Sequence, residues 1–290
     1  MNQLIDLIKL SRPHQWVKNV FVFTGFIFGH AWGDMDMLLR VVVAAAGFSL
    51  MASSVYVLND IVDREQDAKH PKKKNRPLAA GRISVKLAAV WGVVVAIIGL
   101  GLGLWVSLEV FYMLLAYSIM NVAYSLHFKH VVLIDVFIIA AGFMLRILAG
   151  TLGLGIPPSQ WLLLCGLMIT LFLGFTKRRA ELITMGEDKS SSRKVLEHYS
   201  PVLLDKMIGI TASGVIMSYS LYTMSPETIR IHGSEYLIYT VPFVMYGIFR
   251  YIYLLHHQQG GTDTAHDLKR DPWMILTVLG WLGTTLWLIS

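Results

Sequence analysis

Long apolar segments, separated by short polar connections, dominate the sequence. Nine of them, each roughly 16–22 residues long, reach the length with which an α-helix crosses the hydrocarbon core of a bilayer. They cover residues 16–32, 37–58, 85–106, 110–126, 131–153, 160–176, 205–224, 235–255 and 272–289. Strands of a membrane barrel are shorter and alternate in polarity, a pattern that these segments lack. The sequence therefore predicts an all-α integral membrane protein with nine transmembrane helices, organised as a single polytopic domain over residues 1–290.

The composition excludes the main soluble alternatives. Only 15% of the residues are charged and the mean hydropathy is +0.56, whereas soluble domains carry about 25% charged residues. A soluble globular enzyme and a disordered chain are both excluded on this basis. Cys165 is the one cysteine of the chain, so no internal disulfide framework is possible.

The charges are distributed very unequally between the two sides of the predicted membrane layout. Nearly all lysines and arginines fall on the side of the N-terminus; Arg40 and Arg230 fall on the other side, and Arg146 lies within the fifth segment. The positive-inside rule makes the basic side cytoplasmic. We therefore expect a protein of the cytoplasmic (inner) membrane. Its N-terminus and its two large polar loops, after segments 2 and 6, are expected in the cytoplasm, and its C-terminus on the opposite side.

A cluster of acidic residues follows the second segment. On a continuing helix, Asn59, Asp63 and Asp67 lie on one stripe, with Asp60 at its edge. Carboxylates at this spacing repel one another unless a cation lies among them, and oxygen-only ligands suit Mg²⁺ rather than zinc. The pattern predicts that Asn59, Asp60, Asp63 and Asp67 bind Mg²⁺ and that the three aspartates act in catalysis. A solvated helix end with nearby counter-ions is the alternative.

Basic residues follow the acidic cluster, at 72–74 and 76. Arg76 lies next to Pro77, in a constrained segment, and a planar guanidinium is the preferred bidentate ligand of phosphate. The lysine run, which includes Lys73, is explained equally well by phosphate binding and by attraction to acidic lipids. Ser84 is expected to cap the helix of the third segment.

The first polar loop also resembles a known signature. Asn59-Asp-x-x-Asp-x-x-x-Asp67, followed by Asn75-Arg-Pro-Leu-x-x-Gly81, is similar to the signature of the UbiA-type intramembrane prenyltransferase superfamily. The resemblance implies an all-helical fold around a central cavity. It also implies a site formed by the two polar cytoplasmic loops and a diphosphate bound through Mg²⁺.

The second polar loop indicates a particular branch of that superfamily. Ordinary members carry a second Asp-rich motif there, whereas this chain has Lys177-Arg178-Arg179-Ala-Glu181. Together with segments 12–19, 59–81, 124–129, 135–150 and 193–199 and the pair at 250–251, this motif resembles the decaprenyl-phosphate phosphoribosyltransferases. The resemblance implies transfer of a 5-phosphoribosyl group from phosphoribosyl pyrophosphate to a polyprenyl phosphate, with release of diphosphate and inversion at C1.

Residues that would bind the substrate phosphates and ribose hydroxyls are expected in both polar loops and at adjacent helix ends. They are Lys18, Asn59, Lys73, Arg76, Tyr124, Lys129, Asp135, Lys177, Arg178, Glu181 and Arg193. Asp135 lies inside the fifth segment, where burial is costly, so we expect it to be functional or paired. Arg146 is expected to pair with Glu109.

Three other functions compete with this hypothesis. An aromatic prenyltransferase of the same superfamily, making a quinone or haem precursor, is the main alternative. A membrane transporter and a non-catalytic protein that binds polyprenyl phosphate are the others. We expect the bilayer and the two phosphorylated substrates as partners, and no nucleic acid; the oligomeric state and the isoprenoid length stay open.

Overall fold

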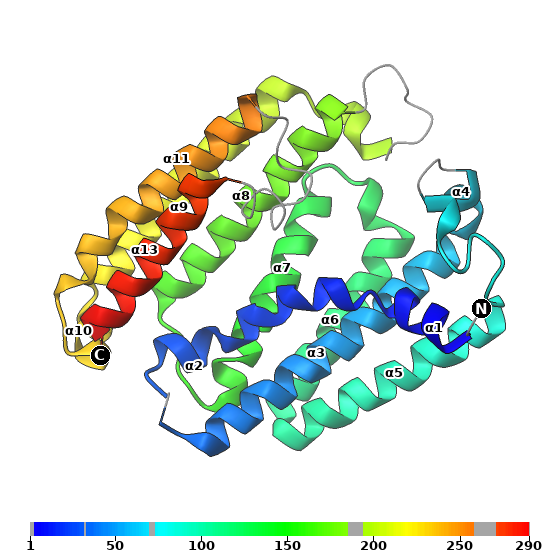
Figure 1. Cartoon of the computed structure of the whole chain (residues 1–290), viewed down its shortest axis with the longest axis horizontal. Coiled ribbons are helices and arrows are strands. Elements are labelled where there is room, and N and C mark those ends of the chain that lie inside the picture. Colours follow the sequence, from blue (N-terminus) through cyan, green and yellow to red (C-terminus); the bar gives the residue numbers. More distant parts are fainter. Residues whose placement is uncertain (1–2, 32, 70–72, 185–193, 258–270, 290) are drawn as a thin grey trace. The chain divides into compact units, whose positions relative to one another are not determined.

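Every regular element in the described residues is a helix (Figure 1). The computed structural model describes residues 3–31, 33–69, 73–184, 194–257 and 271–289. Within them, eight helical stretches are long and apolar enough to cross a membrane. They are Met35–Val62, Val85–Val106, Leu108–Leu126, Ile134–Leu154, Gln160–Thr184, Pro201–Met224, Tyr236–His257 and Pro272–Ile289. These eight match eight of the nine predicted segments, so the all-helical membrane class is confirmed.

The helices carry the following bounds. The long ones are α3 (Met35–Val62), α5 (Val85–Val106), α6 (Leu108–Leu126), α7 (Ile134–Ala149), α8 (Gln160–Thr184), α9 (Pro201–Met224), α11 (Val241–His257) and α13 (Pro272–Ile289). The short α-helices are α1 (Gln3–Ser11), α2 (Thr24–Phe28), α4 (Arg64–Lys69) and α10 (Pro226–His232). The 3₁₀ helices are η1 (Pro13–Phe23), η2 (Lys73–Asn75), η3 (Phe128–His130), η4 (Leu152–Leu154), η6 (Lys194–His198) and η7 (Tyr236–Thr240).

The chain divides into two compact units, each built from two separate stretches. Unit 1 comprises Met1–Val131 and Gly142–Pro158, and unit 2 comprises Val132–Ala141 and Ser159–Ser290. Helix α7 therefore begins in unit 2 and ends in unit 1.

Side-chain caps fix where several long helices begin. Asp34 accepts a hydrogen bond from the backbone of Met37 at the start of α3, at 3.0 Å. Ser84 accepts one from Leu87 at the start of α5, at 3.2 Å. Such caps satisfy backbone N–H groups that have no partner within the helix. The expected cap at Ser84 is thus confirmed.

The first predicted segment, 16–32, does not form one α-helix in the described residues. Its sequence lies instead in η1 and the short helix α2. Because Trp16 donates to Ser53 (3.0 Å) and Asn19 donates to Ser49 (2.8 Å), η1 runs antiparallel to α3. A buried core that includes Val22 and Phe48 forms between them.

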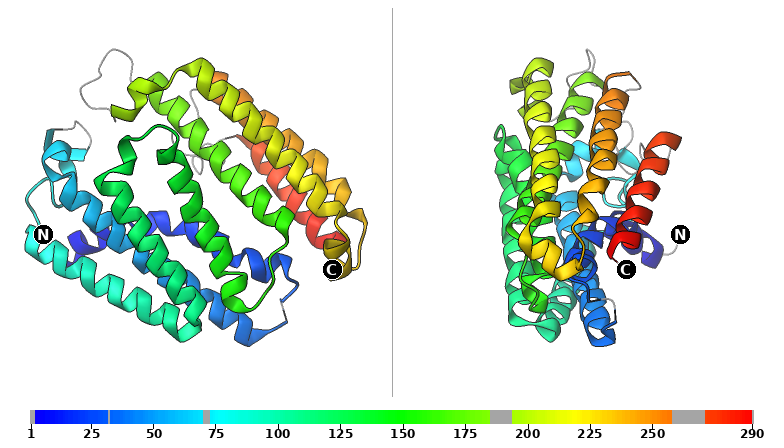
Figure 2. Two further views of the ribbon diagram at one scale, coloured as in Figure 1. Left: turned by 180° about the vertical axis from the view of Figure 1, so that it is seen from behind. Right: turned by 90° about the vertical axis from the view of Figure 1, so that its left-hand side faces the viewer.

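Helices α3 and α5 pack closely within unit 1 and lie side by side in both figures (Figures 1 and 2). A Cβ atom on Gly99 would lie 3.1 Å from the backbone oxygen of Gly47 and 3.3 Å from the backbone nitrogen of Met51. Small residues let membrane helices approach this closely, and packing rather than water exclusion then holds them together. Unit 1 thereby gains a rigid frame for the end of α3.

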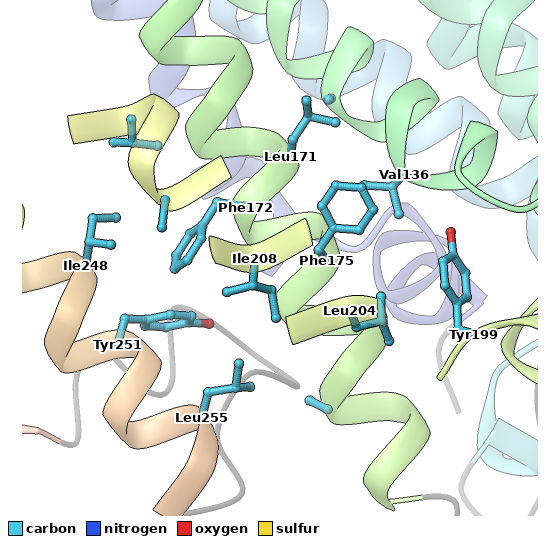
Figure 3. Close-up of a cluster of buried hydrophobic side chains, with 14 of the residues drawn as sticks. Val136, Leu171, Phe172, Phe175, Tyr199, Leu204, Ile208, Ile248, Tyr251 and Leu255 are labelled. Atoms are coloured by element: carbon cyan, nitrogen blue, oxygen red, sulfur yellow. The ribbon is translucent and has the colours of Figure 1, made fainter. Parts of the chain in front are cut away.

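Unit 2 is a helical group with its own apolar core (Figure 3). Helix α8 packs along α9, and α11 contacts both α9 and α13. Phe172 and Phe175 of α8 lie in the same buried cluster as Ile208 and Tyr251 (Figure 3). This core fixes the C-terminal half of α8, which carries the basic motif at 177–181.

Candidate functional site

The predicted stripe of Asn59, Asp63 and Asp67 requires one continuous helix through the acidic motif. The structure does not have one. Helix α3 ends at Val62, Asp63 has a non-helical backbone, and α4 begins at Arg64. The prediction of one continuous carboxylate stripe is therefore wrong. The backbone N–H of Asp67 still donates to the carbonyl oxygen of Asp63 across this break, at 2.8 Å, so Asp60 and Asp67 stay on one face.

Asp60 and Asp67 converge on a single nitrogen atom of Arg76. Nη1 of Arg76 lies 3.1 Å from Oδ1 of Asp60 and 2.5 Å from Oδ2 of Asp67. Nζ of Lys73 lies 3.8 Å from the other oxygen of Asp67. Both aspartates are buried, so their interactions with these cations are screened less than at a surface. This arrangement, which we call the Arg76 centre, joins Asp60, Asp67, Lys73 and Arg76.

Asp63 and Asn59 have different partners. Nζ of Lys129, in η3, donates to Oδ1 of Asp63 at 2.7 Å. The hydroxyl of Ser125, near the end of α6, donates to the amide oxygen of Asn59. The end of α6 and the following turn thus bring Lys129 to the acidic motif.

Arg12 is a site residue that the sequence interpretation did not single out. Its guanidinium donates to Asp60 and lies 5.1 Å from the centre of the Tyr56 ring. Its backbone is left-handed, with φ +50°, a conformation that costs free energy in a residue other than glycine. Left-handed backbone clusters at functional sites. The Arg12-Pro13 dipeptide before an apolar segment was the available signal.

The two carboxylates of the Arg76 centre, those of Asp60 and Asp67, are ligands that suit a hard divalent cation. Two carboxylates already share one positively charged nitrogen, and Mg²⁺ is usually held by one or two carboxylates plus water and substrate phosphate. In the described part of the chain, however, no group of three or more Asp, Glu, His or Cys residues lies close enough to bind a metal. Of the three aspartates, Asp60 and Asp67 converge, while Asp63 contacts Lys129.

A second charged cluster lies in unit 2 and centres on Arg178. Nε of Arg178 lies 2.9 Å from Oδ2 of Asp135, and both side chains are almost completely buried, at 1% and 0% exposure. Glu181 also contacts the guanidinium. Asp135 is therefore paired, as expected. The pairing makes Arg178 part of a buried ion network.

Tyr199 completes this network. Its hydroxyl donates to Oδ1 of Asp135 at 2.9 Å and accepts the backbone N–H of Leu133 at 2.7 Å. Burial raises the pKa of the Tyr199 phenol, so the hydroxyl keeps its proton near neutral pH. Leu133 has a φ of +67°, which is rare for a bulky residue. The tyrosine thus holds a strained turn at the start of α7.

The other basic residues of the α8 motif have separate surroundings. Nε of Arg179 lies 2.5 Å from Oδ1 of Asp205 in α9, so this cation is also paired. Lys177 is half-buried in the same helix. The sequence interpretation counted three cations at the motif without the acidic partners that neutralise two of them.

Four further residues complete the comparison with the sequence predictions. Lys18 lies on η1 and Tyr124 in α6, both half-buried and both in unit 1. Arg193 lies outside the described residues. Arg146 does not pair with Glu109: its Nε donates to Asn19, at 2.6 Å. That expectation was wrong because neutral acceptors satisfy the buried guanidinium.

The chain was compared with families and with known proteins. The UbiA prenyltransferase family model matches residues 19–270. A decaprenyl-phosphate phosphoribosyltransferase of Corynebacterium glutamicum is 34% identical over 95% of this chain and 84% of its own length. The enzyme of the same name from Mycolicibacterium smegmatis is 31% identical over 98% of this chain and 92% of its own length.

The fold comparison agrees with the family match. A UbiA homologue from Archaeoglobus fulgidus, solved with GPP and Mg²⁺, covers 98% of this chain and 99% of its own, with a TM-score of 0.74 and 18% identity. At that identity the likeness shows the fold alone. From the family match and these two near-full-length relatives, the chain belongs to the UbiA prenyltransferase family.

Proposed function

We propose that the protein transfers a 5-phosphoribosyl group from phosphoribosyl pyrophosphate to a polyprenyl phosphate. The near-full-length similarity to two decaprenyl-phosphate phosphoribosyltransferases carries this proposal. In the reaction, an oxygen of the lipid phosphate forms a bond to C1 of the ribose while the bond from C1 to the diphosphate breaks. The diphosphate leaves with the bonding electrons, and C1 is inverted.

The charges of unit 1 support a substrate with several phosphates. Three aspartates of the acidic motif are contacted by four cations, which are Arg12, Lys73, Arg76 and Lys129. The group is therefore net positive before any substrate binds. Because the lipid phosphate is already ionised near neutral pH, the reaction needs no strong general base. Positioning and charge neutralisation supply the catalysis.

Individual residues receive distinct roles in this proposal. Asp60 and Asp67 would hold Mg²⁺, which when bound neutralises charge on the diphosphate leaving group. Lys73 and Arg76 would bind diphosphate oxygens. Lys18, Asn59, Asp63, Tyr124 and Lys129 would orient the substrates within unit 1. Asp135, Lys177, Arg178, Glu181 and Arg193 stay predictions as substrate-binding residues.

We also propose nine membrane crossings, with η1 and α2 as the first. A 3₁₀ helix rises about 2 Å per residue, so the 11 residues of η1 span about 22 Å and the 5 residues of α2 add about 7 Å. The total is about 30 Å, the thickness of the hydrocarbon core. With eight further spans, the N-terminus is cytoplasmic and the C-terminus lies opposite. The interleaving of the two units along the chain supports a single polytopic domain over 1–290.

The proposed activity is tested with purified protein in detergent. We expect Mg²⁺, phosphoribosyl pyrophosphate and a defined polyprenyl phosphate to give a phosphoribosyl lipid, identified by mass spectrometry. The variant Asp67→Ala should lose at least about 100-fold in rate, as when one group that stabilises transition-state charge is removed. Asp36→Ala, which removes an exposed aspartate elsewhere on α3, is the matched control and should keep its rate.

Two results would overturn the proposal. One is turnover of a prenyl diphosphate with an aromatic acid, together with no product from the phosphoribosyl donor; this identifies an aromatic prenyltransferase. The other is full activity of Asp67→Ala, which removes that aspartate from the site. Product formation in detergent, where no gradient exists, excludes a pure transporter.

A further inference from the structure

The 3₁₀ helix η1 is unusual in its length. It runs for 11 residues, whereas 3₁₀ stretches beyond three or four residues are uncommon because their hydrogen-bond geometry is poor. With about three residues per turn, every third residue lies on one face. Asn19 and Val22 are buried, whereas Val17 and Val20 are 62% and 56% exposed. The exposure pattern of η1 thus repeats every three residues.

The rise of three residues in η1 equals the rise of four residues in the neighbouring helix α3. Three 3₁₀ residues rise about 6 Å, and four α-helical residues rise about 6 Å. Trp16 and Asn19, three residues apart, donate to Ser53 and Ser49, four residues apart on α3. If η1 were α-helical, Trp16 and Asn19 would be only about 4.5 Å apart along the axis. The spacing of the two contacts along α3 therefore favours the 3₁₀ form.

Arg146 of α7 reaches η1 from another direction. Its Nε donates to Oδ1 of Asn19 (2.6 Å), Nη1 donates to the backbone oxygen of Gly142 (2.7 Å) and Nη2 donates to the hydroxyl of Tyr117 (3.1 Å). The guanidinium also lies 4.7 Å from the centre of the Tyr117 ring. These partners are neutral, and burying an arginine in a membrane segment is costly. The cation ties η1 to α6 and α7.

The two ends of η1 are fixed differently. At its C-terminal end, a Cβ on Gly150 would lie 1.6 Å from the backbone oxygen of Val22, so η1 lies directly against α7 there. At its N-terminal end, Arg12 precedes η1 and contacts Asp60. Conversion to an α-helix would shorten the 11 residues by about 5 Å. The C-terminal end is held, so the shortening would pull Ser11, whose carbonyl accepts from Ser53 at 2.9 Å, away from α3 and Arg12 away from Asp60, beyond hydrogen-bond distance.

We propose that Arg146 is a positioning residue. Through Asn19 it keeps η1 in the 3₁₀ form, and η1 in turn places Arg12 at Asp60. The conformational part of this proposal is independent of the reaction, whereas its effect on substrate rests on the proposed function.

The conformational part is tested by a distance measurement. Spin labels on cysteines at His14 and Ile27, both exposed, are introduced in a Cys165→Ser background. The two Cα atoms are separated by about 24 Å along the axis in the 3₁₀ form and by about 20 Å in an α-helix. We expect double electron–electron resonance to show a shortening of about 4 Å in Arg146→Met. An unchanged distance in that variant would overturn the proposal.

Two further variants make this measurement specific. Arg40→Met is the matched control, because Arg40 is another arginine of unit 1 that donates to a backbone oxygen, that of Val106, at 3.2 Å. Its distance should equal that of the unsubstituted protein. Asn19→Ala removes the contact to η1 and leaves the bonds of Arg146 to Tyr117 and Gly142. If Arg146→Met does not fold, Asn19→Ala decides: shortening supports the proposal, and an unchanged distance overturns it.

The activity measurement separates this proposal from the proposed function. We expect Asn19→Ala to raise the KM for phosphoribosyl pyrophosphate about tenfold, the scale of one lost charge-assisted hydrogen bond. An unchanged KM with a shortened distance would overturn the link from η1 to substrate. If the unsubstituted protein has no phosphoribosyl transfer activity, the proposed function fails, while the distance shift still decides the role of Arg146.

Discussion

Asp135 and Arg178 form an ion pair that is almost inaccessible to water. Removing two charges from water is costly, and the pair recovers that cost only while both partners are present. Tyr199 and Glu181 bind the two sides of the pair. The pair therefore holds α7 and α8 of unit 2 together at one specific register.

Replacing only one partner of this pair should destabilise the protein strongly. We expect Asp135→Asn or Arg178→Met to lower the free energy of unfolding by about 3–5 kcal/mol, since each leaves a buried charge uncompensated. The double variant Asp135→Leu with Arg178→Met should recover much of that loss. Thermal unfolding in detergent measures all three. A double variant no more stable than the single ones would show that the pair does not act as a unit.

A partner could be predicted for a charged residue where its position in an apolar segment alone makes an unpaired charge costly. Asp135 lies in an apolar segment, so we expect it to have a partner, and in the structure that partner is Arg178. Arg146 has the same signal, yet its partner was predicted wrongly. Its acceptor Asn19 is neutral and lies 127 residues away in the sequence, and no charge pattern marks a neutral acceptor at that distance.

At the scale of elements, the contact between α3 and α5 depends on a glycine that leaves no room for a side chain. Gly99→Leu should lower the free energy of unfolding by about 1–3 kcal/mol, because the added atoms would overlap the backbone of α3. Unfolding in detergent checks this. Gly101→Leu, on the same helix, is the matched control, since nothing lies within 4 Å of a Cβ atom there. Equal losses in both variants would contradict the close packing of α3 and α5.

The eight long helices could be predicted because length and hydrophobicity alone reveal a membrane-spanning helix. The remaining segment, 16–32, does not form one α-helix, because its length and apolar composition do not distinguish an α-helix from a 3₁₀ helix. The break in the helix at Asp63 was also not predicted. The spacing of Asn59, Asp63 and Asp67 suits a helix, and the structure interrupts that helix by one residue. The sequence therefore names the residues of the acidic motif but not which of them come together.

At the scale of the whole molecule, the number of crossings determines on which side each loop lies. We expect an impermeant maleimide, added to intact cells that express the protein, to label a cysteine at Asp36 but not at Leu4 or Glu65. The measurement uses single cysteines in a Cys165→Ser background, at three exposed positions. Permeabilised cells should label all three. Labelling of Leu4→Cys from outside, as for Asp36→Cys, would mean that η1 and α2 do not cross the membrane.

The sidedness of the charges stays a prediction from the sequence, because it depends only on counts along the chain and on the number of crossings. The pairing of those charges could not be predicted from the sequence. Arg178 and Arg179 are neutralised by Asp135 and Asp205, which lie in other helices. An inventory of basic residues therefore overstates how many are available to a substrate.

The matched rise of η1 and α3 restricts how the two segments can change in length during evolution. An insertion of one residue between Trp16 and Asn19 rotates one relative to the other by about 120°, so the two could not both keep their serine partners. Only steps of three residues in η1, matched by four in α3, preserve the contacts. Relatives that differ in length here should therefore differ by three residues in η1 for every four in α3. An alignment that places gaps of equal length in both segments misplaces one of them.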